Sequence, residues 1–232
     1  MKIKVFSLFP ELILNFFHSS IFKNSLKKNL WSLELIDIRK YSENQRIVDD
    51  TPYGGGPGML LKAQPIANAI DQNIKNPYNS KIIYPSPKGL TFNQRRSEYF
   101  ANNFNEISLI CGKYEGIDQR LIEEYNMEEV SLGDYVVSGG EMPTIIIIDA
   151  IIRNLNGVLG TKESLREETF GNNYNSQFSN LLEYPQYTKP RNWRNRTVPK
   201  ILLTGHHENI KKWRLQKSKE ITSKKRPDLL NH

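Results

Sequence analysis

The sequence predicts an α/β fold with a mostly parallel sheet, followed by a small, basic and mainly helical C-terminal domain. Short apolar runs of strand length alternate with segments of helical periodicity, which is typical of parallel sheets covered by helices. The charge balance changes sign toward the C-terminus. With 232 residues, 38% of them hydrophobic, the chain is long enough for one sizeable core and a smaller appended unit.

The first half of the chain contains four short runs rich in Ile, Val, Leu and Phe. These predicted strands cover residues 3–9, 33–38, 81–85 and 106–111. A helix is expected over residues 10–28 and another over 91–103. Thr91, followed three residues later by Gln94, has the spacing of a capping box and predicts where the second helix begins.

The second half continues the alternation and then loses it. A helix near 117–125 is followed by a short strand over 128–133. The run 143–155 is ambiguous, since its β-branched isoleucines favour a strand, whereas its length and Pro143 near its start favour a helix. We expect a helix buried on most sides.

The segment after this helix has little apolar periodicity and many Asn, Ser, Glu and Gly residues. It is typical of a flexible linker about 20 residues long. The predicted organisation is therefore a catalytic domain over 1–160, a flexible linker over 161–180 and a basic helical domain over 181–232.

Composition argues against a membrane or secreted protein. The longest apolar run, "IIIIDAII", is broken by Asp149 and is too short to cross a bilayer, and the N-terminus lacks the pattern of a signal peptide. Cys111 is the single cysteine, so no internal disulfide can form, and one thiol suits a reducing compartment. We expect a cytoplasmic protein.

Basic residues are concentrated at the C-terminus. Residues 189–232 contain 13 Lys and Arg and 3 Asp and Glu, a net charge of +10. The whole chain carries +7, so the residues before this segment carry a small net negative charge. This distribution indicates a polyanionic partner such as nucleic acid, although a solvated charged face is the alternative. Trp193 and Trp213, interleaved with the basic residues, could stack on bases.

Three loops rich in glycine and other small residues lie at or near the ends of predicted strands, at 84–89, 111–120 and 131–143. Ligands of open parallel sheets bind outside the carboxyl ends of strands, so these loops form a candidate site; tight surface turns are the alternative. A fourth loop, 53–59, is the most glycine-dense segment. No dinucleotide or phosphate-loop pattern is present, and His206 and His207 lack partners at zinc spacing, so no metal is expected.

Several motifs together resemble one family. The segments are "LFPE", "VDDTPYGGGPGM", "CGKYEGIDQR", "SLGDYVVSGGE", "LLEYPQYTKP" and "LLTGHHENIKKWR", and they span nearly the whole chain. They are similar to those of the bacterial tRNA (guanine-N1-)methyltransferases of the SPOUT superfamily. The resemblance implies a deep trefoil knot, an obligate homodimer, S-adenosylmethionine as methyl donor, and methylation at N1 of the tRNA guanosine 3′ of the anticodon.

The resemblance also implies which residues bind the donor. In this family the pocket is built largely from main chain, and small residues let backbone groups reach the adenine edge and the ribose. The implied cofactor-binding residues are Ser86, Pro87, Gly112, Tyr114, Gly116, Leu132, Gly133, Asp134, Tyr135, Val136, Val137, Ser138, Gly139 and Gly140.

The implied chemistry needs a general base for the guanine N1 proton and a cation near the guanine O6. The resemblance places the cation at Arg153 and the base at Glu168. The family typically has Asp-Ser-Phe where this chain has Glu168-Thr169-Phe170, so its carboxylate is one methylene longer. Glu167 beside it is the base if the correspondence is displaced by one residue.

Two further departures concern the linker, which is longer than usual at "GNNYNSQ", and Lys113, where arginine is common. Two other functions stay open at this point: a SPOUT methyltransferase acting on another RNA position, and a non-catalytic RNA-binding module. The sequence does not indicate which tRNA isoacceptors are used or whether a divalent ion assists.

Overall fold

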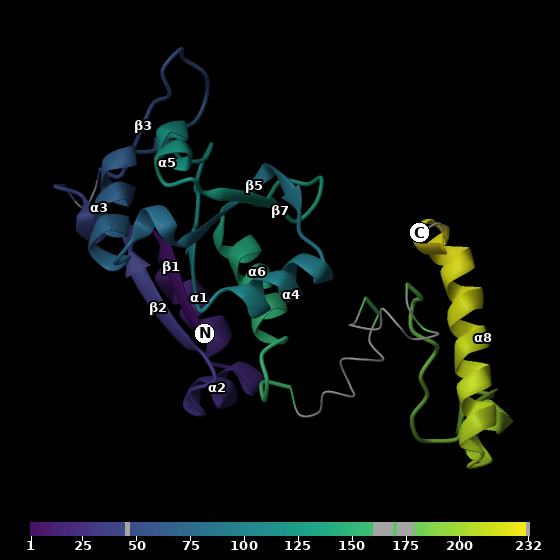
Figure 1. Ribbon diagram of the computed structural model, residues 1–232. Coiled ribbons are helices and arrows are strands. Elements are labelled where there is room, and N and C mark those ends of the chain that lie inside the picture. The colour runs from purple at the N-terminus through teal and green to yellow at the C-terminus, as the bar shows by residue number, and fades with distance from the viewer. Residues whose placement is uncertain (45–46, 160–168, 171–177, 179, 231–232) are drawn as a thin grey trace. The chain divides into compact units, whose positions relative to one another are not determined.

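The computed structural model describes residues 1–44, 47–159, 169–170, 178 and 180–230 (Figure 1). The chain divides into two compact units, Met1–Leu159 and Gly160–His232. Most of the linker predicted over 161–180 lies outside the described residues.

The first unit is built on a parallel sheet of five strands, as predicted. The strand order is β2-β1-β6-β5-β7, and every neighbouring pair is parallel. The strands are β1 (Lys2–Ser7), β2 (Ser32–Asp37), β5 (Lys81–Thr91), β6 (Glu106–Ile110) and β7 (Glu128–Ser131). A small antiparallel pair, β3 (Asp49–Asp50) and β4 (Leu60–Leu61), accompanies this sheet.

Helices cover both faces of the sheet (Figure 1). They are α1 (Pro10–Phe17), α2 (Ser20–Lys27), α3 (Ala63–Asn73), α4 (Gln94–Asn103), α5 (Gln119–Glu124) and α6 (Glu141–Ile152), with short 3-10 turns at Ile38–Tyr41 and Pro77–Asn79. Side chains alternate along each strand, so Ile83 packs in the cluster with α1, α4 and α6, whereas Ile82 packs in the cluster with α3 and α5.

The ambiguous run at 143–155 is helical, as expected. Helix α6 begins at Glu141, two residues before Pro143, and its isoleucines are buried apart from Ile146. Apolar side chains on most sides of a helix indicate that it lies inside the protein.

Two predictions about helix limits are wrong. The helix expected over 10–28 is divided into α1 and α2, because Ser19 adopts an extended backbone and its hydroxyl donates to the carbonyl of Phe16 at 2.7 Å. Thr91 does not cap α4, because it ends β5 and pairs with Ser131 of β7. The cap is Asn93, whose side chain accepts from the Arg96 amide at 3.0 Å.

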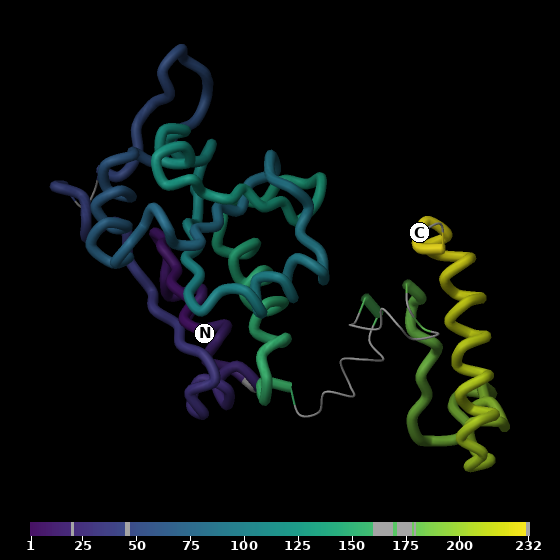
Figure 2. The backbone as a smooth tube through the Cα atoms, in the orientation of Figure 1, coloured from purple at the N-terminus to yellow at the C-terminus, as the bar shows by residue number. Residues whose placement is uncertain are grey.

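The second unit contains the long helix α8 (His207–Lys225), drawn in yellow in Figure 2, with 3-10 turns at Lys200–Leu203 and Pro227–Leu230. Two short strands, β8 (Asn192–Trp193) and β9 (Arg196–Thr197), form an antiparallel hairpin. Thr222 is buried on α8 and accepts a hydrogen bond from the Leu182 amide at 2.8 Å, which attaches the extended segment before the hairpin to the helix. Among the described residues, no helix is both long and apolar enough to span a membrane.

Candidate ligand-binding site

The three predicted loops meet around one cavity of about 310 Å³, at the ends of β6 and β7 and beside residues 84–87 of β5. The segment 86–89 does not follow a strand. It bulges out of β5, because β5 pairs with β7 both before it, at Ile83–Pro85, and after it, at Leu90 and Thr91. The loops after β6 and β7 complete the wall.

Close backbone contact explains the small residues of two loops. The Gly140 amide donates to the Gly112 carbonyl at 2.8 Å. Gly140 has φ −75° and ψ −9°, which alanine adopts without strain, so glycine is not needed here for its conformational freedom. A Cβ at Gly140 would lie 2.6 Å from the Gly112 nitrogen and 2.9 Å from the Cys111 Cα, so the space is already filled by main chain.

Two side chains hold the loop 138–140 in place. The Lys113 ammonium donates to the Ser138 carbonyl at 2.9 Å and lies 5.4 Å from the centre of the Phe9 ring. Glu141 is buried at the start of α6, where its Oε1 accepts from the Ser7 hydroxyl at 2.8 Å. The cavity wall is thereby attached to the first strand and to the loop after β6.

Most of the residues that the resemblance implies for donor binding line this cavity. All of them line it except Asp134 and Ser138, although Ser138 supports the wall through its carbonyl. Sequence reasoning did not select Tyr84, Pro85, Lys113, Glu115, Val130, Ser131 and Pro143, which also line the cavity. These residues lie close in sequence to the selected ones, and that proximity was the signal that could have identified them.

Tyr84 is the largest buried polar side chain of the wall. Burial raises the pKa of its hydroxyl, although a hydrogen bond with the Ile117 backbone acts in the opposite direction. A Cβ on Gly112 would lie 2.8 Å from this hydroxyl, so Gly112 is also confined by close contact. The Tyr84 hydroxyl therefore stays protonated and uncharged at neutral pH.

Arg153, the residue implied for charge stabilisation, is not among the described residues that line this cavity. Arg153 caps α6, and its amide donates to the carbonyl of Asp149 at 3.1 Å. Burial raises the pKa of the half-buried Asp149 carboxyl, and the charge of Arg153 partly offsets that rise. Glu167 and Glu168 both lie outside the described residues.

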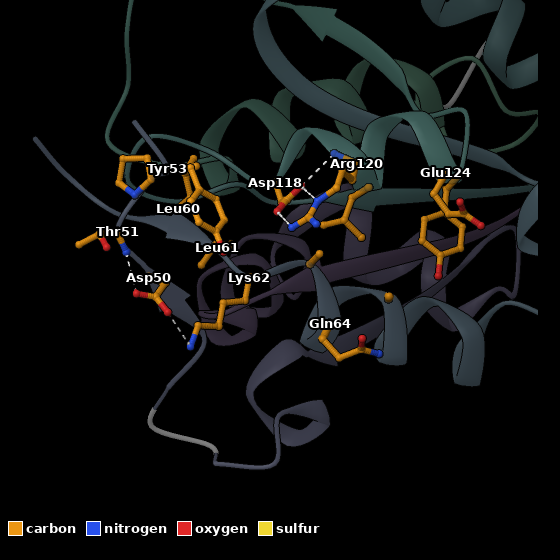
Figure 3. A pocket seen from close by; sticks show the side chains of 15 residues that line it. Asp50, Thr51, Tyr53, Leu60, Leu61, Lys62, Gln64, Asp118, Arg120 and Glu124 are labelled. Atoms are coloured by element: carbon orange, nitrogen blue, oxygen red, sulfur yellow. Dashed lines mark hydrogen bonds and ion pairs between the residues drawn. The ribbon is translucent and has the colours of Figure 1, made fainter. Parts of the chain in front are cut away.

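A second cavity, of about 670 Å³, lies beside the motif "VDDTPYGGGPGM" (Figure 3). Two ion pairs line it: Lys62 donates to Asp50 at 3.1 Å, and Arg120 donates to Asp118 at 2.7 Å. These hydrogen bonds lower the pKa of both carboxyls, so both stay ionised.

Backbone hydrogen bonds connect the walls of the two cavities. The Leu61 amide donates to the Gly116 carbonyl at 3.0 Å, and the Glu115 amide donates to the Met59 carbonyl at 3.0 Å. Gly116 lines the first cavity and Leu61 lines the second. The sequence analysis did not predict this adjacency. Among the described residues, no group of three or more His, Cys, Asp or Glu is placed to hold a metal ion.

Comparison with known proteins places these features in a family. The family model described as tRNA (Guanine-1)-methyltransferase TrmD matches residues 1–232. A tRNA (guanine-N(1)-)-methyltransferase of Anaplasma phagocytophilum (strain HZ) is 44% identical over 231 residues, covering 99% of this chain and 96% of its own. Proteins of the same name from Clostridium botulinum (strain Loch Maree / Type A3) and Wolbachia pipientis wMel are 47% and 41% identical, with 99% of this chain covered.

Proposed function

The chain belongs to the tRNA (guanine-1)-methyltransferase family and is a tRNA (guanine-N1)-methyltransferase; beyond this we propose that its donor is S-adenosylmethionine and its target the guanosine 3′ of the anticodon. The observation that carries the proposal is the family match over the whole chain, together with the cavity that the family's loops line here. The two functions left open by the sequence, an enzyme for another RNA position and a non-catalytic module, fit this match less well.

The first cavity suits the proposed donor in size and in chemistry. Its volume lies within the range of ligand pockets, roughly 300–1,000 Å³. A Cβ at Gly140 would collide with backbone, and a Cβ at Gly112 would collide with the ring of Tyr84. The wall therefore has no room for side chains at these two positions, which leaves main-chain groups to contact a ligand. When bound, S-adenosylmethionine supplies a methyl group already activated on its sulfonium, so this chain has to provide alignment above all.

We assign Glu168 as the general base and Arg153 as the cation in the proposed mechanism. The proton on guanine N1 must leave as N1 becomes bonded to the methyl group, and a positioned carboxylate accepts it. The negative charge that develops on the guanine O6 is stabilised by the Arg153 guanidinium. Glu167 takes the role of the base if the correspondence with the family is displaced by one residue.

The basic second unit is proposed to hold the tRNA. Helix α8 carries exposed lysines, among them Lys211 and Lys212, on a stretch with few acidic residues. Cations that contact phosphates release bound counterions, which favours association and makes it sensitive to salt.

The homodimer and the knot also remain proposals. Helices α1 and α6 pack together and expose apolar side chains, with Leu12 and Phe16 on α1 and Met142 and Ile146 on α6. A second copy of the chain would cover this surface, and we propose that it does. The knot is supported by the path after β7, which returns to the end of β6, where Gly140 bonds Gly112. We further propose that the enzyme acts in the cytoplasm.

The test is incubation of the protein with labelled S-adenosylmethionine and bulk tRNA, followed by mapping of the methylated position. Label at N1 of the guanosine 3′ of the anticodon supports the proposal. Label on a ribose hydroxyl, or on ribosomal RNA instead of tRNA, indicates another SPOUT reaction. RNA binding without methyl transfer indicates a binding module.

A further inference from the structure

The hairpin of residues 191–198 presents its turn in a defined geometry. Trp193 pairs with Arg196, and the two turn residues between them, Arg194 and Asn195, have positive φ values of 49° and 63°. Two consecutive positive φ values are typical of the tight turn that joins antiparallel strands. The Val198 amide donates to the Arg191 carbonyl at 3.0 Å and closes the base of the hairpin.

Trp193 is exposed on this hairpin, unlike the other tryptophans of the chain. Its side chain is 57% exposed, whereas Trp31 is 2% exposed in the core of the first unit. Trp213 is half-buried on α8, with its ring centre 6.5 Å from that of Tyr187. The Arg194 guanidinium lies 4.9 Å from the centre of the Trp193 ring. A large aromatic ring left in water beside a cation suggests a surface for a ligand.

The segment of the chain that contains Trp193 carries only positive charge. No acidic residue occurs between Glu183 and Glu208 in the sequence, and residues 186–197 are all exposed. The cations of this stretch are Lys189, Arg191, Arg194, Arg196 and Lys200. Among the described residues, no carboxylate forms an ion pair with the three arginines of the hairpin, so their charge is available to a polyanion.

We propose that the hairpin is an RNA-reading element in which one unpaired base stacks on Trp193 and the hairpin arginines contact the flanking phosphates. Unpaired bases of RNA stack on aromatic side chains and on guanidinium planes, and both are present here. The inference rests on the proposed function, since it takes the tRNA substrate as the source of that base. From the sequence, Trp193 and Trp213 were equal candidates for stacking on a base. The structure favours Trp193, because Trp213 is half-buried and packs beside Tyr187.

The turn offers a matched pair of variants. Glycine adopts positive φ readily, so both Arg194→Gly and Asn195→Gly preserve the hairpin, but the first alone removes the cation. Arg194→Gly should weaken equilibrium binding of tRNA several-fold and lower the slope of log K against log salt by about 0.7–0.9. Asn195→Gly should bind as the wild type does. Equal binding by both variants would overturn the role of Arg194.

The second arm tests the stacking itself. Trp193→Ala should weaken tRNA binding by roughly 5- to 100-fold, and Trp193→Phe by less, because phenylalanine keeps a stacking face. An anticodon stem-loop RNA should quench the tryptophan fluorescence of the wild type, and Trp193→Phe should lose most of that quenching. The affinity for S-adenosylmethionine, measured by isothermal titration, should stay unchanged in every hairpin variant.

The outcomes are separable from those of the proposed function. Wild-type protein that methylates tRNA, while Trp193→Ala binds tRNA normally, overturns the inference and leaves the enzyme assignment intact. If the wild-type protein does not bind tRNA, both the inference and the proposed function are overturned. A change of sedimentation coefficient in Trp193→Ala without RNA would show that Trp193 contacts protein instead, which also overturns the inference.

Discussion

The contact between Gly140 and Gly112 predicts a large effect from a single methyl group. In Gly140→Ala the new Cβ starts 2.6 Å from the Gly112 nitrogen, whereas ordinary contact begins at 3.4 Å, so the two loops must separate by about 0.8 Å. Overpacking of this kind costs about 1–3 kcal/mol. The separation also breaks the hydrogen bond from the Gly140 amide to the Gly112 carbonyl, which contributes about 0.5–1.5 kcal/mol.

Together these costs reach about 1.5–4.5 kcal/mol, and both glycines line the proposed donor cavity. If the donor binds only to the loops in this arrangement, the affinity for S-adenosylmethionine should fall roughly 10- to 1,600-fold, at about 1.4 kcal/mol per tenfold. Isothermal titration measures the affinity, and circular dichroism with thermal melting shows whether the variant is folded. A folded Gly140→Ala protein that binds the donor within threefold of the wild type would refute the reasoning.

The neighbouring glycine supplies the control. A Cβ at Gly139 would meet the ends of two flexible side chains, 2.7 Å from Glu141 Oε2 and 3.1 Å from Lys113 Nζ, instead of backbone. A side-chain end can shift more readily than backbone, although Lys113 and Glu141 are both hydrogen-bonded here. Gly139→Ala should therefore lower the donor affinity by less than Gly140→Ala does, by about tenfold or less, which corresponds to about one hydrogen bond. An equal loss in both variants would mean that any added bulk in this loop is harmful and that the backbone contact is not the cause.

Three further predictions concern RNA binding, the dimer and the base. Charge reversal at Lys211 and Lys212 should weaken tRNA binding and flatten its salt dependence while donor binding stays unchanged, and an unaltered salt slope would contradict the role of α8. Mixing Gly140→Val chains with Glu168→Gln chains should restore partial activity if the linker and second unit of one chain complete the site of the other; no recovery after confirmed subunit exchange would mean that each site forms within one chain. Glu168→Gln should slow single-turnover methylation roughly 10²–10⁴-fold with little effect on donor or tRNA affinity, whereas Glu167→Gln should do little, and exchanged phenotypes would make Glu167 the base.

The sequence by itself determined the parallel sheet and the general place of the site. Apolar runs such as 81–85 and 106–111 bury both faces of a strand, and that local pattern indicates a strand whatever it pairs with. The carboxyl ends of parallel strands share one edge, so small-residue loops that follow β6 and β7 were bound to lie near one another. Composition also located the basic segment on which α8 and the hairpin are found.

The tertiary structure decided the features that depend on long-range pairing. Thr91 has the spacing of a cap but belongs to β5, because β7 continues the strand beyond the bulge at 86–89. The sequence indicated that Gly140 is small, but the reason, the Gly112 backbone 28 positions earlier, appears only when the two loops meet. Likewise Trp193 and Trp213 both lie among basic residues in the sequence, and only the fold shows that the first is exposed and the second half-buried beside Tyr187. Contacts between distant segments are set by register and packing, and a short window of residues does not contain them.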